Sequence, residues 1–300
     1  MASSQRTRSR RPNARRDREP RYVAPVLDPS WVSPYAPTTA ERHRHAVVMR
    51  SYALRRRLVA TVAAGAAVAA LVVLAVALSP WLWLAAVLVG ALYAIDLRRV
   101  VAGYATRAQG AAEALLARFA RDEDPIARER LVTLVDRLSA TFGVEAVRAE
   151  VVSDGGYNAA LVPGPGGYVM VATSALVQDF ALIEMEGVVA HCLARERIGV
   201  LERECVAALD LTGEAARALA GPGETFRADE VAAATIRYPL GIADALRRCR
   251  AQSVPAGSFF LDEAFDGWRW VFFNPWSDRR EGVPSDLDDP EVRARALEEW

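Results

Sequence analysis

The stretch whose residue types could do chemistry is GVVAHCLARERIG, residues 187–199. Small and apolar residues lead into His191, and Arg195 follows four positions later. The zinc-binding pattern H-E-x-x-H places two histidines on one face of a helix and uses the glutamate as general base. Cys192 stands where that glutamate would be, and Arg195 stands where the second histidine would be. The stretch is therefore either a zinc site that has lost its chemistry or a helix with one buried histidine.

Residues from which another metal site could be built are scarce. The chain of 300 residues has only three histidines, which are His43, His45 and His191. Its three cysteines form no C-x-x-C pair, so neither a disulfide framework nor a structural zinc site is predicted; they are Cys192, Cys205 and Cys249. The 37 basic and 37 acidic side chains cancel, so the net charge indicates no class of partner.

Residues 1–45 are expected to be a disordered basic tail. They are rich in Arg, Ser and Pro and lack an apolar periodicity that could bury a core. Eight arginines lie within residues 1–22, against Asp17 and Glu19. We expect a solvated cytoplasmic tail that helps to set membrane topology. Docking on anionic lipid, or the less favoured binding of nucleic acid, is the alternative.

A transmembrane hairpin is predicted over residues 46–104. Residues 58–78 carry no charge and are long enough to span a bilayer, and after Ser79–Pro80 a shorter apolar run covers residues 81–97. Arginines flank both outer ends of the pair, and tryptophans lie at the connecting turn. The prediction is a two-span protein of a bacterial inner membrane with cytoplasmic N- and C-termini. A signal peptide cleaved after residues 75–77 is the rival, but its basic leader would be unusually long.

A soluble domain of mixed α+β type, mainly helical with a small sheet, is expected over residues 105–300. A helix over 124–143 is predicted from Asp124 as N-cap, Pro125 at the first position and Gly143 at the stop. Its apolar residues predict a buried stripe of Leu131, Leu134, Val135, Leu138 and Phe142. Further elements are expected in this order: a strand at 144–152, a turn-rich link, a strand starting at 168, a long helix over 179–209, a helix near 227–250 and a closing helix in DPEVRARALEEW.

This order of parts resembles the HtpX-like membrane zinc metallopeptidases. The resemblance is carried by the membrane hairpin, NAALVPGPGGYVMVATSALV, VVAHCLARERIG, TFRADEVAA (225–233), FFNPWS (272–277) and DPEVRARALEEW. It implies a zincin-like domain, with two helices that supply the ligands of a catalytic zinc ion. His191 matches the first ligand, Arg195 the second ligand and Thr225 the third ligand, while Asp229 matches a retained aspartate of the second helix.

The departures from that family pattern remove the expected zinc chemistry. Arginine stays protonated and has no lone pair to donate, so Arg195 is not a ligand. It also adds positive charge where a dication would lie, and two unit charges 4 Å apart repel by about 4 kcal/mol at an effective dielectric constant of 20. Cys192 replaces the general base, and neutral Thr225 replaces a carboxylate. No catalytic residue and no zinc or other cofactor is therefore expected, with His191 the only retained ligand position.

Other roles for these residues follow from helix geometry. Adjacent residues diverge by about 100° around a helix, so Cys192 and His191 are poorly placed as a thiol–imidazole pair. Cys192 is expected to be a buried structural residue. His191 is expected to be a core histidine that forms a hydrogen bond with Asp229. Arg195 is expected to form an ion pair with Asp229 and to fill the space of the metal.

The resemblance also implies a peptide-binding strand. Proteases of the family lay an extended substrate along an edge strand, which corresponds to Tyr168, Val169, Met170, Val171, Ala172 and Thr173. An open edge can bind a peptide by strand addition even without catalysis. The alternative is an ordinary sheet edge without a ligand.

Three functions are consistent with the sequence. The favoured one is a non-catalytic, pseudoprotease-type membrane protein that binds an unidentified protein or peptide partner. The first alternative is an active membrane zinc metalloendopeptidase with an atypical site. The second is tethering of nucleic acid or anionic lipid to the membrane through the arginine-rich tail.

Overall fold

The part of the chain that the structure describes combines helices with one small sheet, so the fold is α+β. The structure is a computed structural model that describes residues 38–40, 43–44, 47–48, 51, 57–210, 224–275 and 289–300. Most of the predicted tail therefore lies outside the described residues. Residues 39–40 and 43–44 are helical, where disorder was predicted.

Four strands form the sheet in the order β1-β2-β4-β3. They are β1 (Ala120–Arg121), β2 (Val147–Ser153), β3 (Ala159–Gly164) and β4 (Gly167–Thr173). β4 pairs in parallel with β2 and antiparallel with β3, so its backbone is bonded on both sides. The prediction that residues 168–173 form an edge strand is therefore wrong. β3, which the sequence analysis assigned to a turn-rich link, takes the edge position instead.

Helix α5 (Pro125–Phe142) forms as its local sequence predicts. The carboxylate of Asp124 accepts a hydrogen bond from the backbone N–H of Ile126 at 2.9 Å. Gly143 ends the helix with φ of 63°, a left-handed conformation that favours glycine. The predicted apolar stripe is buried, and α5 packs against β2.

Two helices that were predicted as continuous are each broken in two. The pattern over 179–209 forms α7 (Leu182–Arg197) and α8 (Leu201–Asp210), separated at Gly199, whose φ is 72°. The pattern near 227–250 forms α10 (Glu224–Ile236) and α11 (Pro239–Ala251). Pro239, the first residue of α11, disfavours a helical conformation at Tyr238, so α10 does not continue into α11 and ends at Ile236. The shorter elements are α4 (Ala111–Leu116), α6 (Ser174–Asp179), η1 (Phe259–Leu261), α12 (Phe265–Trp268) and η2 (Arg269–Val271), and the closing helix is α13 (Pro290–Glu298).

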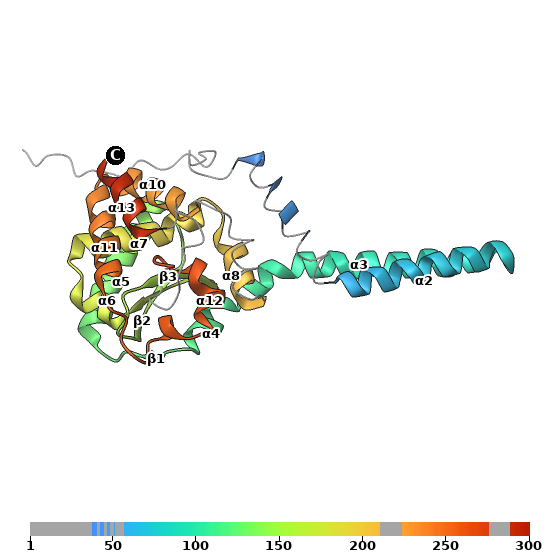
Figure 1. Cartoon of the computed structure of the whole chain (residues 1–300), viewed down its shortest axis with the longest axis horizontal. Coiled ribbons are helices and arrows are strands. Elements are labelled where there is room, and N and C mark those ends of the chain that lie inside the picture. The colour runs from blue at the N-terminus through green and yellow to red at the C-terminus, as the bar shows by residue number, and fades with distance from the viewer. Residues whose placement is uncertain are drawn as a thin grey trace, which may run out of the picture. The chain divides into compact units, whose positions relative to one another are not determined.

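Helix α7 lies in the centre of the domain. It contacts α5, α10, α11 and β3, and α11 in turn packs on α13 (Figure 1). Two glycines allow the close approach of α7 and α11. A Cβ atom on Gly241 would lie 2.6 Å from the carbonyl oxygen of Ile183, and one on Gly187 would lie 2.8 Å from the backbone nitrogen of Ile242. The crossing thus holds α7 against its neighbours by direct backbone contact.

The substitution Gly241→Ala is expected to destabilise the domain by about 1–3 kcal/mol, because the new methyl group forces the two backbones apart. The better helix propensity of alanine, about 1 kcal/mol, does not offset a clash with backbone atoms. Urea denaturation of the purified protein measures this loss. Gly90→Ala is the control, because a Cβ there meets nothing within 4 Å. An unchanged denaturation midpoint for Gly241→Ala would contradict the tight crossing.

One described helix is long and apolar enough to cross a membrane. This helix, α2 (Leu58–Ala77), exposes most of its side chains, and Ala75 is its buried residue. It packs against α3 (Leu82–Ala108), with a hydrogen bond between Thr61 and Tyr93 and an ion pair between Arg57 and Asp96. α3 runs beyond the predicted span of 81–97 and through the predicted domain boundary as one helix.

Candidate functional site

The site predicted from the sequence lies on the buried face of α7. His191 and Arg195 are one helical turn apart and therefore project from the same face. Both are fully enclosed, with 0% and 1% of their surface exposed. Charged side chains are almost never fully buried unless they are paired. The partners of these two residues therefore determine what the site can do.

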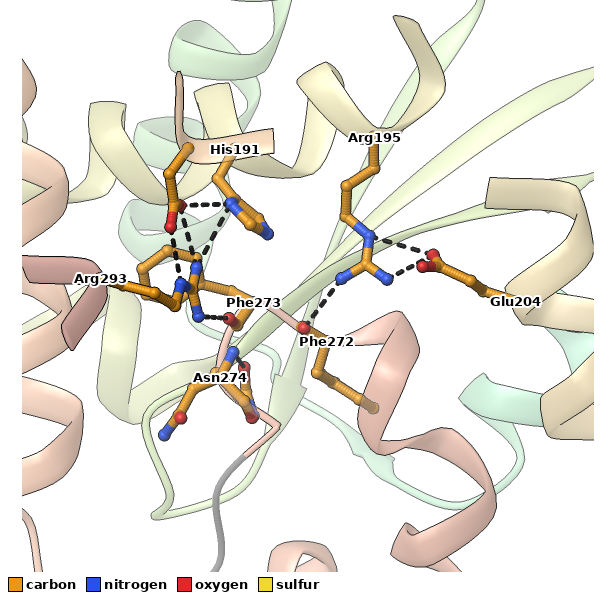
Figure 2. A network of polar contacts seen from close by, with 9 residues as sticks. His191, Arg195, Glu204, Phe272, Phe273, Asn274 and Arg293 are labelled. Carbon is orange, nitrogen blue, oxygen red and sulfur yellow. Dashed lines mark hydrogen bonds and ion pairs between the residues drawn. The ribbon is translucent and has the colours of Figure 1, made fainter. Parts of the chain in front are cut away.

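His191 belongs to a buried cluster with Asp229 of α10 and Arg293 of α13. Its Nδ1 atom lies 2.7 Å from Oδ1 of Asp229, as the sequence predicted (Figure 2). Arg293 holds the same carboxylate with two nitrogens, Nε at 2.6 Å and Nη2 at 2.9 Å. This bidentate arrangement is the strongest form of an arginine–carboxylate pair. Both oxygens of Asp229 are thus engaged by protein groups.

Arg195 belongs to a second buried ion pair. Its Nε atom donates to Oε2 of Glu204 at 3.1 Å, and its Nη2 atom donates to the same carboxylate (Figure 2). The predicted pair of Arg195 with Asp229 is wrong. The reason is that the chain turns at Gly199, between α7 and α8, and Glu204 of α8 then lies beside Arg195. Arg293 of the closing helix α13 lies beside Asp229 instead.

These contacts fix the charges of the cluster at neutral pH. Burial, with a smaller effect of Arg293 and Arg195, lowers the pKa of His191 to about 4 despite the neighbouring carboxylate. Burial alone would raise the pKa of Asp229, but Arg293 and His191 outweigh it and lower that pKa to about 2. The cluster is therefore a neutral imidazole, a carboxylate and a guanidinium.

Glu224 at the start of α10 has the opposite perturbation. It forms an ion pair with Arg203, but burial and the nearby Glu204 raise its pKa to about 7. The shift indicates a carboxyl group that is only partly ionised at neutral pH. The domain thus holds two titrating groups whose effects on stability oppose each other.

We expect the variant Glu224→Gln to lose about 3 kcal/mol of stability relative to the natural protein between pH 7 and pH 4. The pKa of His191 is depressed in the folded state, so its contribution is complete above pH 6.5 and is lost as the pH falls through 4. The pKa of Glu224 is raised, so ionisation costs stability near pH 7, and that cost disappears towards pH 4.5. Each effect amounts to about 3 kcal/mol, because one pKa unit corresponds to about 1.4 kcal/mol.

Urea denaturation at both pH values checks this expectation. The natural protein has both effects, which offset each other, whereas the variant keeps only the loss from His191. Glu230→Gln, at an exposed acid of the same helix, is the control and should follow the natural protein. A parallel pH dependence of Glu224→Gln and the natural protein would show that one of the two assigned shifts is wrong.

The cysteines of the domain are not activated as nucleophiles. Cys192 is fully buried, and burial raises the pKa of its thiol to about 12. Burial also raises the pKa of Cys249 to about 12 and that of Cys205 well above its ordinary value. The thiolate is the nucleophilic form of cysteine, so these thiols are inert at neutral pH.

The site does not fit a zinc ion. The Nε2 atom of His191 is buried and has no hydrogen-bond partner among the described residues. It is therefore the one ring nitrogen of His191 whose lone pair could bind a metal ion. The guanidinium of Arg195 projects from the same face of α7 as His191, and that of Arg293 lies beside His191. Both oxygens of Asp229 already accept hydrogen bonds from His191 and Arg293. Thr225 is buried one turn before Asp229 on α10 and offers a neutral hydroxyl. Within the described ranges, no three His, Cys, Asp or Glu side chains converge.

Sequence reasoning brought His191, Arg195, Thr225 and Asp229 onto two packed helices but missed their main partners. Arg293 stands in DPEVRARALEEW, a segment that the resemblance singled out without giving the arginine a role. Glu204 lies in a region that was predicted as one long helix with α7. The charges of Arg195 and Asp229 indicate that each needs a counterion when it is buried, but they do not identify which residue supplies it.

Comparison with known proteins adds no family assignment. No protein-family model matches the chain, and no curated protein matches its sequence.

Proposed function

We propose that this chain is a membrane-anchored, non-catalytic relative of the HtpX-like zinc metallopeptidases that acts by binding a protein or peptide. The observation that carries the proposal is the cluster of His191, Asp229 and Arg293. A guanidinium engages the carboxylate that the pattern retains, and a second guanidinium on Arg195 stands at a ligand position.

Hydrolysis of a peptide bond by such a site needs a bound water of lowered pKa and a general base. Zinc supplies the first and a glutamate the second in the pattern H-E-x-x-H. The base position here is a buried thiol, and the ligand positions carry one imidazole, one guanidinium and one hydroxyl. The scaffold is therefore proposed to serve recognition.

The proposed location is the cell membrane, with two spans and both termini in the cytoplasm. The apolar α2 supports the first span. The second span uses the apolar first half of α3, and the arginines at 55–57 and 98–99 then lie on the same, cytoplasmic side. The arginine-rich tail would face the same side and can contact anionic lipid.

A cleavage assay tests the proposal. The full chain, purified in detergent and incubated with excess zinc, is expected to leave unfolded casein intact. His191→Ala serves as the matched control for any contaminating protease. Cleavage that a chelator abolishes and that His191→Ala lacks would overturn the proposal in favour of an active enzyme with an atypical site.

A further inference from the structure

The edge of β3 that does not pair with β4 is occupied by a segment of the chain itself, residues 271–274, which we call the strap. Ala160 of β3 and Phe272 of the strap form an isolated antiparallel bridge. The backbone N–H of Phe273 donates to the carbonyl oxygen of Ala159 at 2.8 Å. The strap therefore lies along the sheet as a short added strand.

Two arginines bind successive carbonyl groups of the strap. Nη1 of Arg195 donates to the carbonyl oxygen of Phe272 at 3.1 Å, and Nη1 of Arg293 donates to that of Phe273 at 3.0 Å (Figure 2). These are the same arginines that are paired with Glu204 and Asp229. The buried charges thus hold the backbone of an extended segment.

The side chain of Asn158 completes this backbone recognition. Its Nδ2 donates to the carbonyl oxygen of Asn274 at 2.8 Å, and its Oδ1 accepts from the N–H of Asn274 at 3.0 Å. Together the sheet edge, the arginines and Asn158 bind three consecutive backbone units. All of these contacts are made to backbone atoms of the strap, so the backbone of another extended peptide in the same place could form them too.

Aromatic contacts supply the selectivity that the backbone contacts lack. The ring of Phe273 meets that of His191 edge to face, with centroids 5.1 Å apart, and Arg293 lies 5.3 Å from the Phe273 centroid. The ring of Phe272 packs edge to face on Phe260 at 5.3 Å. Phe272 and Phe273 are both fully buried. Each therefore fills a place shaped for an aromatic ring.

We propose that the edge of β3 beside α7 is a binding site for an extended peptide with two consecutive aromatic residues, and that the strap is its built-in occupant. The inference rests on the proposed peptide-binding function and names the site and ligand class for it. A peptide of this kind binds only when the strap leaves, so occupation by the strap keeps the site closed. The two buried arginines, Arg195 and Arg293, then have a role in recognition through the carbonyl groups that they bind.

The variant Phe273→Ala tests the proposal, because it weakens the strap but leaves the residues of the site unchanged. The probe is the synthetic peptide Trp-Val-Phe-Phe-Asn-Pro, which copies residues 270–275. The full-length variant in detergent is expected to bind this probe at least about tenfold more tightly than the natural protein does. Saturating probe should raise its thermal midpoint by about 5 °C, because a ligand that binds only the folded state stabilises it.

Two controls make the result specific. The peptide Trp-Val-Ala-Ala-Asn-Pro should neither bind nor stabilise the variant. Phe265→Ala opens a hole in the same aromatic cluster outside the strap, since its ring lies 5.8 Å from that of Phe272, and it should show no rescue by the probe. Equal binding of the two peptides by Phe273→Ala, or no binding of either, would overturn the proposal.

If Phe273→Ala fails to fold, hydrogen exchange of the natural protein decides. The strap amides are expected to exchange through a local opening, faster than those of β4. Exchange of both only through global unfolding would show that the strap is a permanent part of the core. Such a failure would remove the peptide site but leave the non-catalytic proposal intact, because that proposal is tested by the cleavage assay and by the zinc content of the protein.

Discussion

Replacing Arg293 with methionine is expected to destabilise the folded domain by about 3–5 kcal/mol at pH 8. The side chain is fully buried, and its removal leaves the carboxylate of Asp229 with His191 alone. Removing one partner of a buried ion pair lowers the stability of the fold strongly, because the remaining charge is neither paired nor hydrated. Urea denaturation gives the loss. Arg295→Met on the same helix is the control, since Arg295 is 71% exposed in its side chain and its pair with Glu291 contributes little.

The pH dependence of Arg293→Met distinguishes this cause from a simple packing defect. Without the guanidinium, the positive form of His191 becomes the natural partner of Asp229, so the pKa of His191 rises. A raised pKa of a base stabilises the fold at low pH, and that stability is lost as the pH rises through it. The destabilisation should therefore shrink from pH 8 to pH 5.5. A constant loss across this range would contradict the charge assignment of the cluster.

Replacing Arg195 with methionine is expected to cost a similar amount, about 3–5 kcal/mol, because the buried carboxylate of Glu204 loses the guanidinium that forms an ion pair with it. The double variant Arg195→Met with Glu204→Leu should recover most of that loss. Buried ion pairs are often no more stabilising than apolar residues of similar size, since each charge has lost its hydration. The curves of the natural protein, Arg195→Met, Glu204→Leu and the double variant together form a double-mutant cycle. Additive losses in the double variant would show that Glu204 has a different principal partner.

The sequence predicted those elements whose signals are local. The N-cap Asp124, the proline after it and the stop at Gly143 define α5 within one stretch of chain, and the structure agrees. The pairing of His191 with Asp229 was also foreseen, since both residues lie on helices that the resemblance brought together. Local rules suffice where a residue and its partner are placed by their own segments.

The errors in strand order and in ion pairing concern partners that are distant in the chain. Whether β4 lies inside the sheet or at its edge depends on β3, whose Ala, Pro and Gly residues gave the pattern of a link although both of its faces are buried. Arg293 is 64 residues from Asp229, and Arg195 reaches Phe272 across 77 residues. No periodicity reports such contacts, so the replacement of the expected pair of Arg195 and Asp229 by two separate ion pairs could not be read from the sequence.

The buried site contains two separate ion pairs, Arg195 with Glu204 and Arg293 with Asp229. Each buried arginine has a carboxylate partner and also binds a strap carbonyl, so the electrostatics are satisfied without a metal ion. The buried charges of the site are thus compensated by one another and by the backbone carbonyl groups of Phe272 and Phe273.

Metal analysis of the purified full-length protein shows whether the site around His191 binds zinc. After growth with added zinc and removal of weakly bound metal by gel filtration, we predict far less than one zinc ion per chain, and the same value for His191→Ala. One zinc ion per chain in the natural protein, lost in His191→Ala, would contradict the account.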